Sequence, residues 1–134
     1  MAFLDDNYLI TNAAGVKLFE KIKSLPVIDP HNHANVKEIA DNNCYTDAWQ
    51  LFAATDHYVW EMLRKREVPE ELITGKNISA HDKFLAMAKV FSEIAGNPVY
   101  EWIHLDLKRY FGIEELLCEK NGEKIWCADR KSVV

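Results

Sequence analysis

The sequence predicts a mostly α-helical domain with one short strand near its N-terminus. The chain has 134 residues, of which 49% are hydrophobic and 28% charged, as in one globular domain of ordinary size. Apolar residues recur with helical spacing along most of the chain. The apolar run at 25–28 is instead typical of a short buried strand, and Pro30 ends it because proline has no N–H to donate. A lone strand has no pairing partner, so either this interpretation is wrong and the chain is a helical bundle, or the chain lacks the other strands.

Polar capping residues and helix breakers bound each expected element. The expected elements of the first half are a helix over 13–24, the strand over 26–29, a short helix from about 35 to 41, and helices that begin after Thr46 and at Asp56. Their caps are assigned to Thr11 or Asn12, to Thr46 and to Thr55. The second half is expected to contain a loop over 67–78, a helix from Ser79 to Ala95, a helix over 99–111 and a last helix over about 113–126.

Charge and composition exclude several classes of partner. The formal net charge is −5, and the basic clusters, such as 64–66 and 130–131, are short runs, so a nucleic-acid surface is not expected. No apolar run approaches the roughly 18 residues of a membrane span, and the N-terminus is acidic where a signal peptide is basic. Cys44, Cys118 and Cys127 form no Cys-x-x-Cys motif, which favours reduced thiols. We therefore expect a cytoplasmic protein with no membrane partner.

His31 and His33 directly follow the expected strand. In an extended segment, side chains at i and i+2 project from the same side, so the two imidazoles can reach one ion. A catalytic zinc site normally has three protein ligands, so this is a partial site. The alternative is two ordinary loop histidines. The strand context favours the metal, because open sheets and barrels place their chemistry at the carboxyl ends of strands.

The helix from Asp56 has two distinct faces. One stripe is apolar and consists of Val59, Met62 and Leu63. The other face is formed by residues spaced at i, i+3, i+4 and i+7, which are His57, Trp60, Glu61 and Arg64. A histidine and an arginine with an aromatic residue between them suit a binding face. Plain solvent-exposed surface is the alternative interpretation of the same pattern.

Five blocks of sequence together resemble a known family. They are FLDDNYLI at 3–10, LPVIDPHNH at 25–33, DHYVWEMLR at 56–64, GNPVYEW at 96–102 and HLDLKRYFG at 104–112. The blocks resemble the N-terminal part of the uronate isomerase family, also called glucuronate isomerase, an outlying branch of the amidohydrolase superfamily. The resemblance covers about residues 3–125.

The resemblance implies a distorted (β/α)8 TIM barrel of which this chain holds only a part. Residues 1–35 would form an arm, a helix and the first barrel strand with its His-x-His motif. Residues 36–126 would form a helical insertion domain. Residues 127–134 do not follow the family pattern and are interpreted as an aberrant tail of a truncated or frame-shifted product.

The implied reaction is aldose–ketose isomerisation of a uronate sugar. D-glucuronate would become D-fructuronate, and D-galacturonate would become D-tagaturonate, by proton transfer between C2 and C1, which requires an acid/base pair. His31 and His33 would bind a divalent metal, zinc. His57 and Tyr58 would contact the substrate, and the helix dipole favours the neutral imidazole of His57. Arg64 is a candidate for the sugar carboxylate, with an exposed structural role as its alternative.

We expect no turnover from this chain alone, because the family's acidic metal ligand and further substrate-binding residues are absent. The competing hypothesis is a non-catalytic helical module that binds metal or a partner. Such a module should bury Val27, Ile28, Trp102 and Leu105. An isomerase fragment should expose apolar surface and self-associate as a homo-oligomer. A hydrolase of the wider superfamily is a third interpretation, which rests on His-x-His alone.

Overall fold

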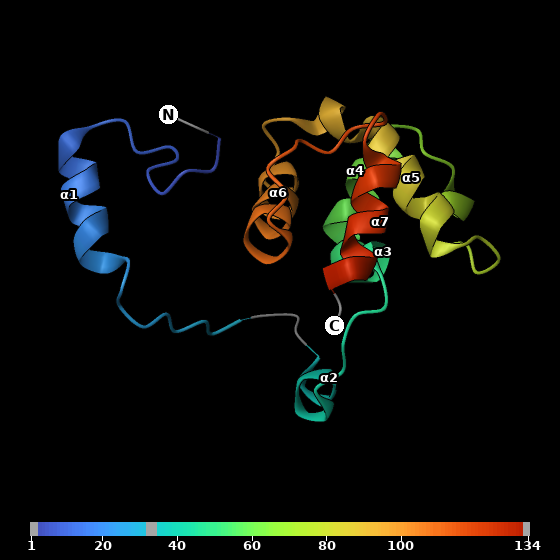
Figure 1. The fold of residues 1–134 in the computed structure, drawn as a ribbon, viewed down its shortest axis with the longest axis horizontal. Coiled ribbons are helices and arrows are strands. Elements are labelled where there is room, and N and C mark those ends of the chain that lie inside the picture. The colour runs from blue at the N-terminus through green and yellow to red at the C-terminus, as the bar shows by residue number, and fades with distance from the viewer. Residues whose placement is uncertain (1–2, 32–34, 133–134) are drawn as a thin grey trace. The chain divides into compact units, whose positions relative to one another are not determined.

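The computed structural model describes residues 3–31 and 35–132, and within them it is helical, with no strand. In chain order the helices are α1 (Ala13–Ile22), α2 (Val36–Asp41), α3 (Ala48–Phe52), α4 (His57–Lys65), η1 (Glu70–Leu72), α5 (Ala80–Phe91), η2 (Ser92–Ile94), α6 (Pro98–Phe111) and α7 (Gly122–Ser132) (Figure 1). The prediction of a mostly α-helical chain is therefore confirmed. The chain divides into two compact units, Met1–Asn43 and Cys44–Val134, which are described separately.

The expected strand over 26–29 is wrong for this chain. Residues 26–29 have no regular secondary structure, and Val27 and Ile28 are 91% and 89% exposed. The physical reason is that a strand exists only when a second strand satisfies its N–H and C=O groups, and no described residue supplies one. The apolar composition of the segment predicted burial, but a local pattern cannot show whether a second strand is present to pair with it.

The first unit has no hydrophobic core among its described residues. Helix α1 is capped as predicted, with the side chain of Asn12 accepting a hydrogen bond from the Gly15 N–H at 2.8 Å. Its apolar residues Leu18 and Ile22 are nevertheless exposed. Helix α2 likewise begins after Asn35 and buries no residue. The described apolar side chains of this unit are therefore exposed or only partly buried.

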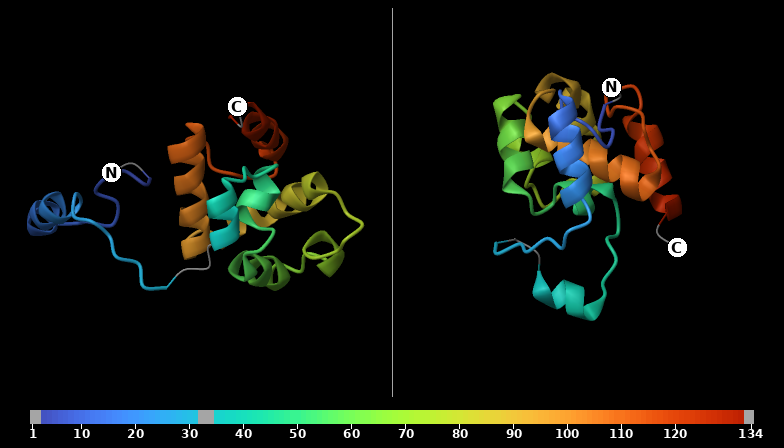
Figure 2. Two further views of the ribbon diagram at one scale, coloured as in Figure 1. Left: turned by 90° about the horizontal axis from the view of Figure 1, so that it is seen from below. Right: turned by 90° about the vertical axis from the view of Figure 1, so that its left-hand side faces the viewer.

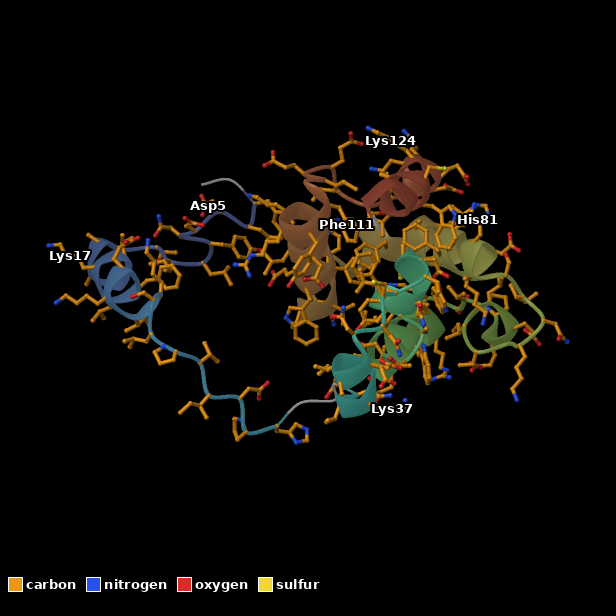
Figure 3. The ribbon with its side chains drawn as sticks, turned by 60° about the horizontal axis from the view of Figure 1, so that its bottom comes forward. Asp5, Lys17, Lys37, His81, Phe111 and Lys124 are labelled. Atoms are coloured by element: carbon orange, nitrogen blue, oxygen red, sulfur yellow. The ribbon has the colours of Figure 1, made fainter. Side chains whose placement is uncertain are left out.

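The second unit is built around α5. Helix α5 packs against α3, α7 and η1, and α6 packs against α7. Figure 2 shows these helices from two further directions. The largest fully buried side chains of the core are Phe84, Phe91, Ile73, Met87, Leu107, Leu117 and Ile125. On α5, His81 Nε2 lies 2.8 Å from a carboxylate oxygen of Glu123 on α7, which links the two helices at the surface. His81 is labelled in Figure 3.

Two of the predicted caps lie one residue too early. Asp47 caps α3 in place of Thr46, and Asp56 caps α4 in place of Thr55. In both cases an aspartate directly follows the threonine, and its carboxylate accepts the free N–H groups of the first turn. The hydroxyl of Thr46 lies instead against the Gln50 side chain.

The last helix begins later than predicted. Residues 113–121 form a loop rather than the start of the helix, and α7 continues through Ser132. The loop is held by the Asn121 side chain, which accepts from the Cys118 N–H at 2.8 Å and donates to the Leu116 carbonyl at 2.9 Å. The helix therefore extends into 127–134, the segment interpreted as a separate tail. The proposed domain limits at 35 and 126 stay predictions.

No described helix combines the length and the apolar character that crossing a membrane requires.

Candidate functional site

His31 lies in an exposed turn after the apolar segment, and His33 lies outside the described residues. The backbone N–H of His31 donates to the Asp29 carboxylate at 3.1 Å, which fixes the backbone at the first histidine. Within the described ranges, no group of three or more His, Cys, Asp or Glu side chains is placed to hold a metal ion. These residues thus do not complete a metal site, and the ligand role of His31 and His33 stays a prediction.

His57 and Tyr58 form a ring pair at the start of α4. The Asp56 carboxylate accepts from the Tyr58 and Val59 N–H groups at 2.8 and 3.3 Å, so it fixes the backbone that carries both rings. The imidazole of His57 and the ring of Tyr58 have centroids 4.4 Å apart and planes tilted by 34°. Both side chains are exposed, so a small molecule can reach them. The predicted pair is close in space, which suits joint contact with one substrate.

Tyr58 lines a groove between α4 and α6. The groove has a volume of about 230 Å³. From α4 it is lined by Tyr58, Glu61, Met62 and Lys65, and from the start of α6 by 97–99 and Trp102. The rings of Tyr58 and Trp102 meet edge to face across it, with centroids 6.4 Å apart and an interplanar angle of 76°. The groove is therefore walled by two aromatic rings from different helices.

The polar groups of the groove are already partly engaged with one another. Lys65 Nζ lies 2.6 Å from a Glu61 carboxylate oxygen, and this hydrogen bond lowers the pKa of Glu61. The Asn97 side-chain amide donates to the Met62 sulfur at 3.3 Å. Since the ion pair is exposed, a ligand can exchange with either partner.

Arg64 is engaged by a carboxylate of the same unit. Its guanidinium donates two hydrogen bonds to Glu70, at 2.8 and 2.6 Å, and Thr74 donates a third to the same carboxylate at 2.6 Å. The Arg64 bond is the largest cause that lowers the pKa of Glu70 to about 2. This contact favours the structural interpretation of Arg64, because a sugar carboxylate would have to displace Glu70.

Trp102 was not predicted as a site residue. The indication of it in the sequence is that the predicted helix over 99–111 is apolar on more than one side. Ile103 and Leu107 are buried, whereas Trp102 is 52% exposed and faces the groove. Sequence patterning shows that such a helix has more apolar residues than one buried stripe needs, but only packing shows which of them lies beside Tyr58.

The side chain of His104, on the same helix as Trp102, has a structural role. His104 is 4% exposed, its Nδ1 lies 2.7 Å from the Tyr100 carbonyl, and its Nε2 accepts from the Leu117 N–H at 2.8 Å. Burial lowers the pKa of His104, and the hydrogen bond to Tyr100 opposes this in part. The neutral tautomer with its proton on Nδ1 satisfies both partners. His104 therefore joins the loop before α7 to α6.

Comparison with known proteins gives consistent matches along the chain. A glucuronate isomerase family model matches residues 1–133. The uronate isomerase of Thermotoga neapolitana is 52% identical over 124 residues, which are 92% of this chain and 27% of that protein. The uronate isomerase of Thermotoga maritima is 50% identical over 131 residues, which are 98% of this chain and 29% of that protein.

A solved structure agrees with the sequence matches. The crystal structure of uronate isomerase from Thermotoga maritima superimposes with a TM-score of 0.93 at 49% identity, covering 99% of this chain and 29% of that one. This chain thus spans less than a third of the length of these relatives. Because the family model and the relatives match nearly its whole length, the chain belongs to the glucuronate isomerase family, as an N-terminal portion of such a protein.

Proposed function

We propose that this chain supplies the N-terminal part of an enzyme that isomerises uronate sugars. The observation that carries the proposal is 50% identity over 131 residues to a protein named uronate isomerase, together with a TM-score of 0.93 to the solved structure. The proposed reactions are D-glucuronate to D-fructuronate and D-galacturonate to D-tagaturonate. A proton leaves C2 and one is added at C1 through a cis-enediol, so the reaction requires no oxidant.

His57 and Tyr58 are the residues to which we assign contact with the substrate. A neutral imidazole can accept a proton from one oxygen or carbon and return it to another near neutral pH. A phenol can donate a hydrogen bond to the carbonyl oxygen on which negative charge develops. The two rings adjoin each other at the exposed start of α4, which supports this assignment.

We assign His31 and His33 as two ligands of a divalent metal, zinc. The described residues offer no completed metal site, so a further ligand has to come from elsewhere. In the complete fold, which we propose to be a (β/α)8 barrel, 26–29 would become the first strand once a neighbouring strand pairs with it. The exposure of Val27 and Ile28 supports this proposal.

The competing hypothesis of a self-sufficient helical module has less support. Such a module should bury Val27, Ile28 and Trp102, and all three are exposed. Leu105, the fourth residue of this criterion, is half-buried. The exposed apolar side chains instead support the hypothesis that the chain is a fragment that self-associates. We propose that the protein is cytoplasmic.

The test has two arms with D-glucuronate, D-galacturonate and added Zn²⁺. The purified chain alone should show no turnover. A chimera in which the 131 matched residues replace those of the Thermotoga maritima enzyme should be active. In this chimera, His57→Ala and a His31→Ala/His33→Ala double variant should each lower kcat at least about a hundredfold.

Lys17→Ala is the matched control, because Lys17 is exposed on α1 and should leave activity unchanged. A folded but inactive chimera would contradict the proposed function. Turnover by the chain alone that disappears in the double histidine variant would show that the missing part of the fold is dispensable. Arg64→Met in the same chimera tests whether Arg64 binds the sugar. A raised KM with unchanged kcat would indicate contact between Arg64 and the sugar carboxylate.

A further inference from the structure

We infer that Trp102 is a positioning residue that holds the ring of Tyr58, and through it the His57–Tyr58 pair, in one orientation. The assignment of Tyr58 to the substrate is taken from the proposed function, on which this inference rests. The contact between Trp102 and Tyr58 is a feature of the second unit alone.

The ring of Tyr58 contacts two other rings. The centroid of the His57 imidazole lies 4.4 Å from it, and that of the Trp102 indole lies 6.4 Å from it at an interplanar angle of 76°. Edge-to-face contact at this spacing is a favourable arrangement of aromatic rings. Tyr58 is itself 50% exposed and lies in the first turn of α4, so its own helix restrains it little. Without the indole, the ring gains access to other staggered rotamers.

The backbone that carries Trp102 is fixed relative to α4. Asn97 caps α6 by accepting from the Val99 N–H at 2.9 Å, and its amide donates to the sulfur of Met62 on α4 at 3.3 Å. Pro98 at the first position of α6 restricts the backbone further. The start of α6 is thus tied to α4, one helical turn before Trp102.

Core packing does not account for the position of Trp102. Tryptophan carries a large apolar surface and is highly buried on average, yet this side chain is 52% exposed. The buried stripe of the same helix includes Ile103 and Leu107 but not Trp102. Trp102 carries no titratable group, so it would act on the reaction only by orienting Tyr58 and not as a catalytic residue.

The test uses the full chain with proton-labelled histidine and tyrosine rings in a deuterated background. Nuclear Overhauser effects between the rings of His57 and Tyr58 report their relative orientation, and Tyr58→Phe assigns them. Trp102→Ala should weaken these effects about threefold, since the ring then spreads over three staggered wells. Trp102→Phe retains an aromatic partner and should restore them. Tyr110→Ala is the matched control, because Tyr110 is exposed on the same helix.

Unchanged effects in Trp102→Ala would overturn the inference, as would loss of the same size in Tyr110→Ala. If Trp102→Ala fails to fold, Trp102→Phe still tests the inference. Weakened Overhauser effects in folded Trp102→Phe would contradict it, because that variant keeps an aromatic ring at position 102. In the chimera described above, Trp102→Ala should lower kcat about tenfold with a smaller change in KM. An inactive parent chimera would refute the proposed function, whereas the ring measurements on the chain would still decide the role of Trp102.

Discussion

His104 is the residue whose protonation should affect stability most directly, since its Nε2 accepts a hydrogen bond from the buried Leu117 N–H. Burial lowers its folded-state pKa, so the unfolded chain takes up the proton first as the pH falls. The stabilisation is therefore complete above about pH 6.5 and decreases below it, by at most about 1.4 kcal/mol per pH unit.

Urea unfolding of the chain at pH 8 and pH 5 measures this effect. His104→Phe should cost about 1–3 kcal/mol at pH 8, because it leaves the Leu117 N–H without a partner, and should reduce the difference between the two pH values. His57→Gln is the control, because His57 is exposed at the start of α4. An equal pH dependence in wild type and His104→Phe would disprove the role of His104.

The Arg64–Glu70 contact gives a second prediction for single residues. The lowered pKa of Glu70, about 2, means that the pair contributes stability above about pH 4.5, and that this contribution is lost as the pH falls toward 2. Arg64→Met should raise the pKa of Glu70 toward its ordinary value, as followed by carbon NMR of the carboxyl group. Lys65→Met should leave Glu70 unchanged, because Lys65 pairs with Glu61.

At the scale of helices, Gly122 sets the distance between α5 and α7. A Cβ at this position would lie 2.8 Å from Ala88 Cβ and 3.3 Å from Leu85 Cδ2, closer than packed atoms approach. Gly122→Ala should therefore destabilise the protein by about 1–3 kcal/mol in urea unfolding. Combining it with Ala88→Gly should recover part of the loss, and strictly additive effects would contradict the contact.

The helices could be predicted from the sequence because their signals are local. Asn12, Ser79 and Asn97 each lie within a few residues of the N–H groups that they cap. Strand pairing at 26–29 would not be local, and no strand is present among the described residues. The loop at 113–121 also depends on a distant residue, since it is held by His104.

The candidate site shows the same difference between local and distant contacts. The sequence was sufficient to predict that His57 lies beside Tyr58, because the two are neighbours in the chain. The approach of Trp102 to Tyr58 depends on how α4 packs against α6, and no local pattern specifies that. The same limit applies to Arg64, whose partner Glu70 lies beyond the end of its helix.

At the scale of the whole molecule, all buried hydrophobic side chains among the described residues lie in 48–126, whereas the described apolar residues of 1–43 are exposed or only partly buried. An exposed and unpaired apolar segment promotes association with other chains. Val27→Lys/Ile28→Lys should therefore lower the apparent mass in light scattering and the binding of a hydrophobic dye, without a change in the melting temperature. Leu116→Lys is the control, since Leu116 is a half-exposed residue of the second unit, and an equal effect there would show that charge alone is responsible.

The uncovered segment at 26–29 also bears on the lifetime of the chain in a cell. Proteases bind their substrates as extended strands, and this segment already has an unpaired backbone with exposed side chains. A cut after Lys23, just before it, would separate α1 from everything that follows. Degradation would thus begin at the residues that precede the predicted metal ligands, and any partner that covers the segment would extend the survival of the chain.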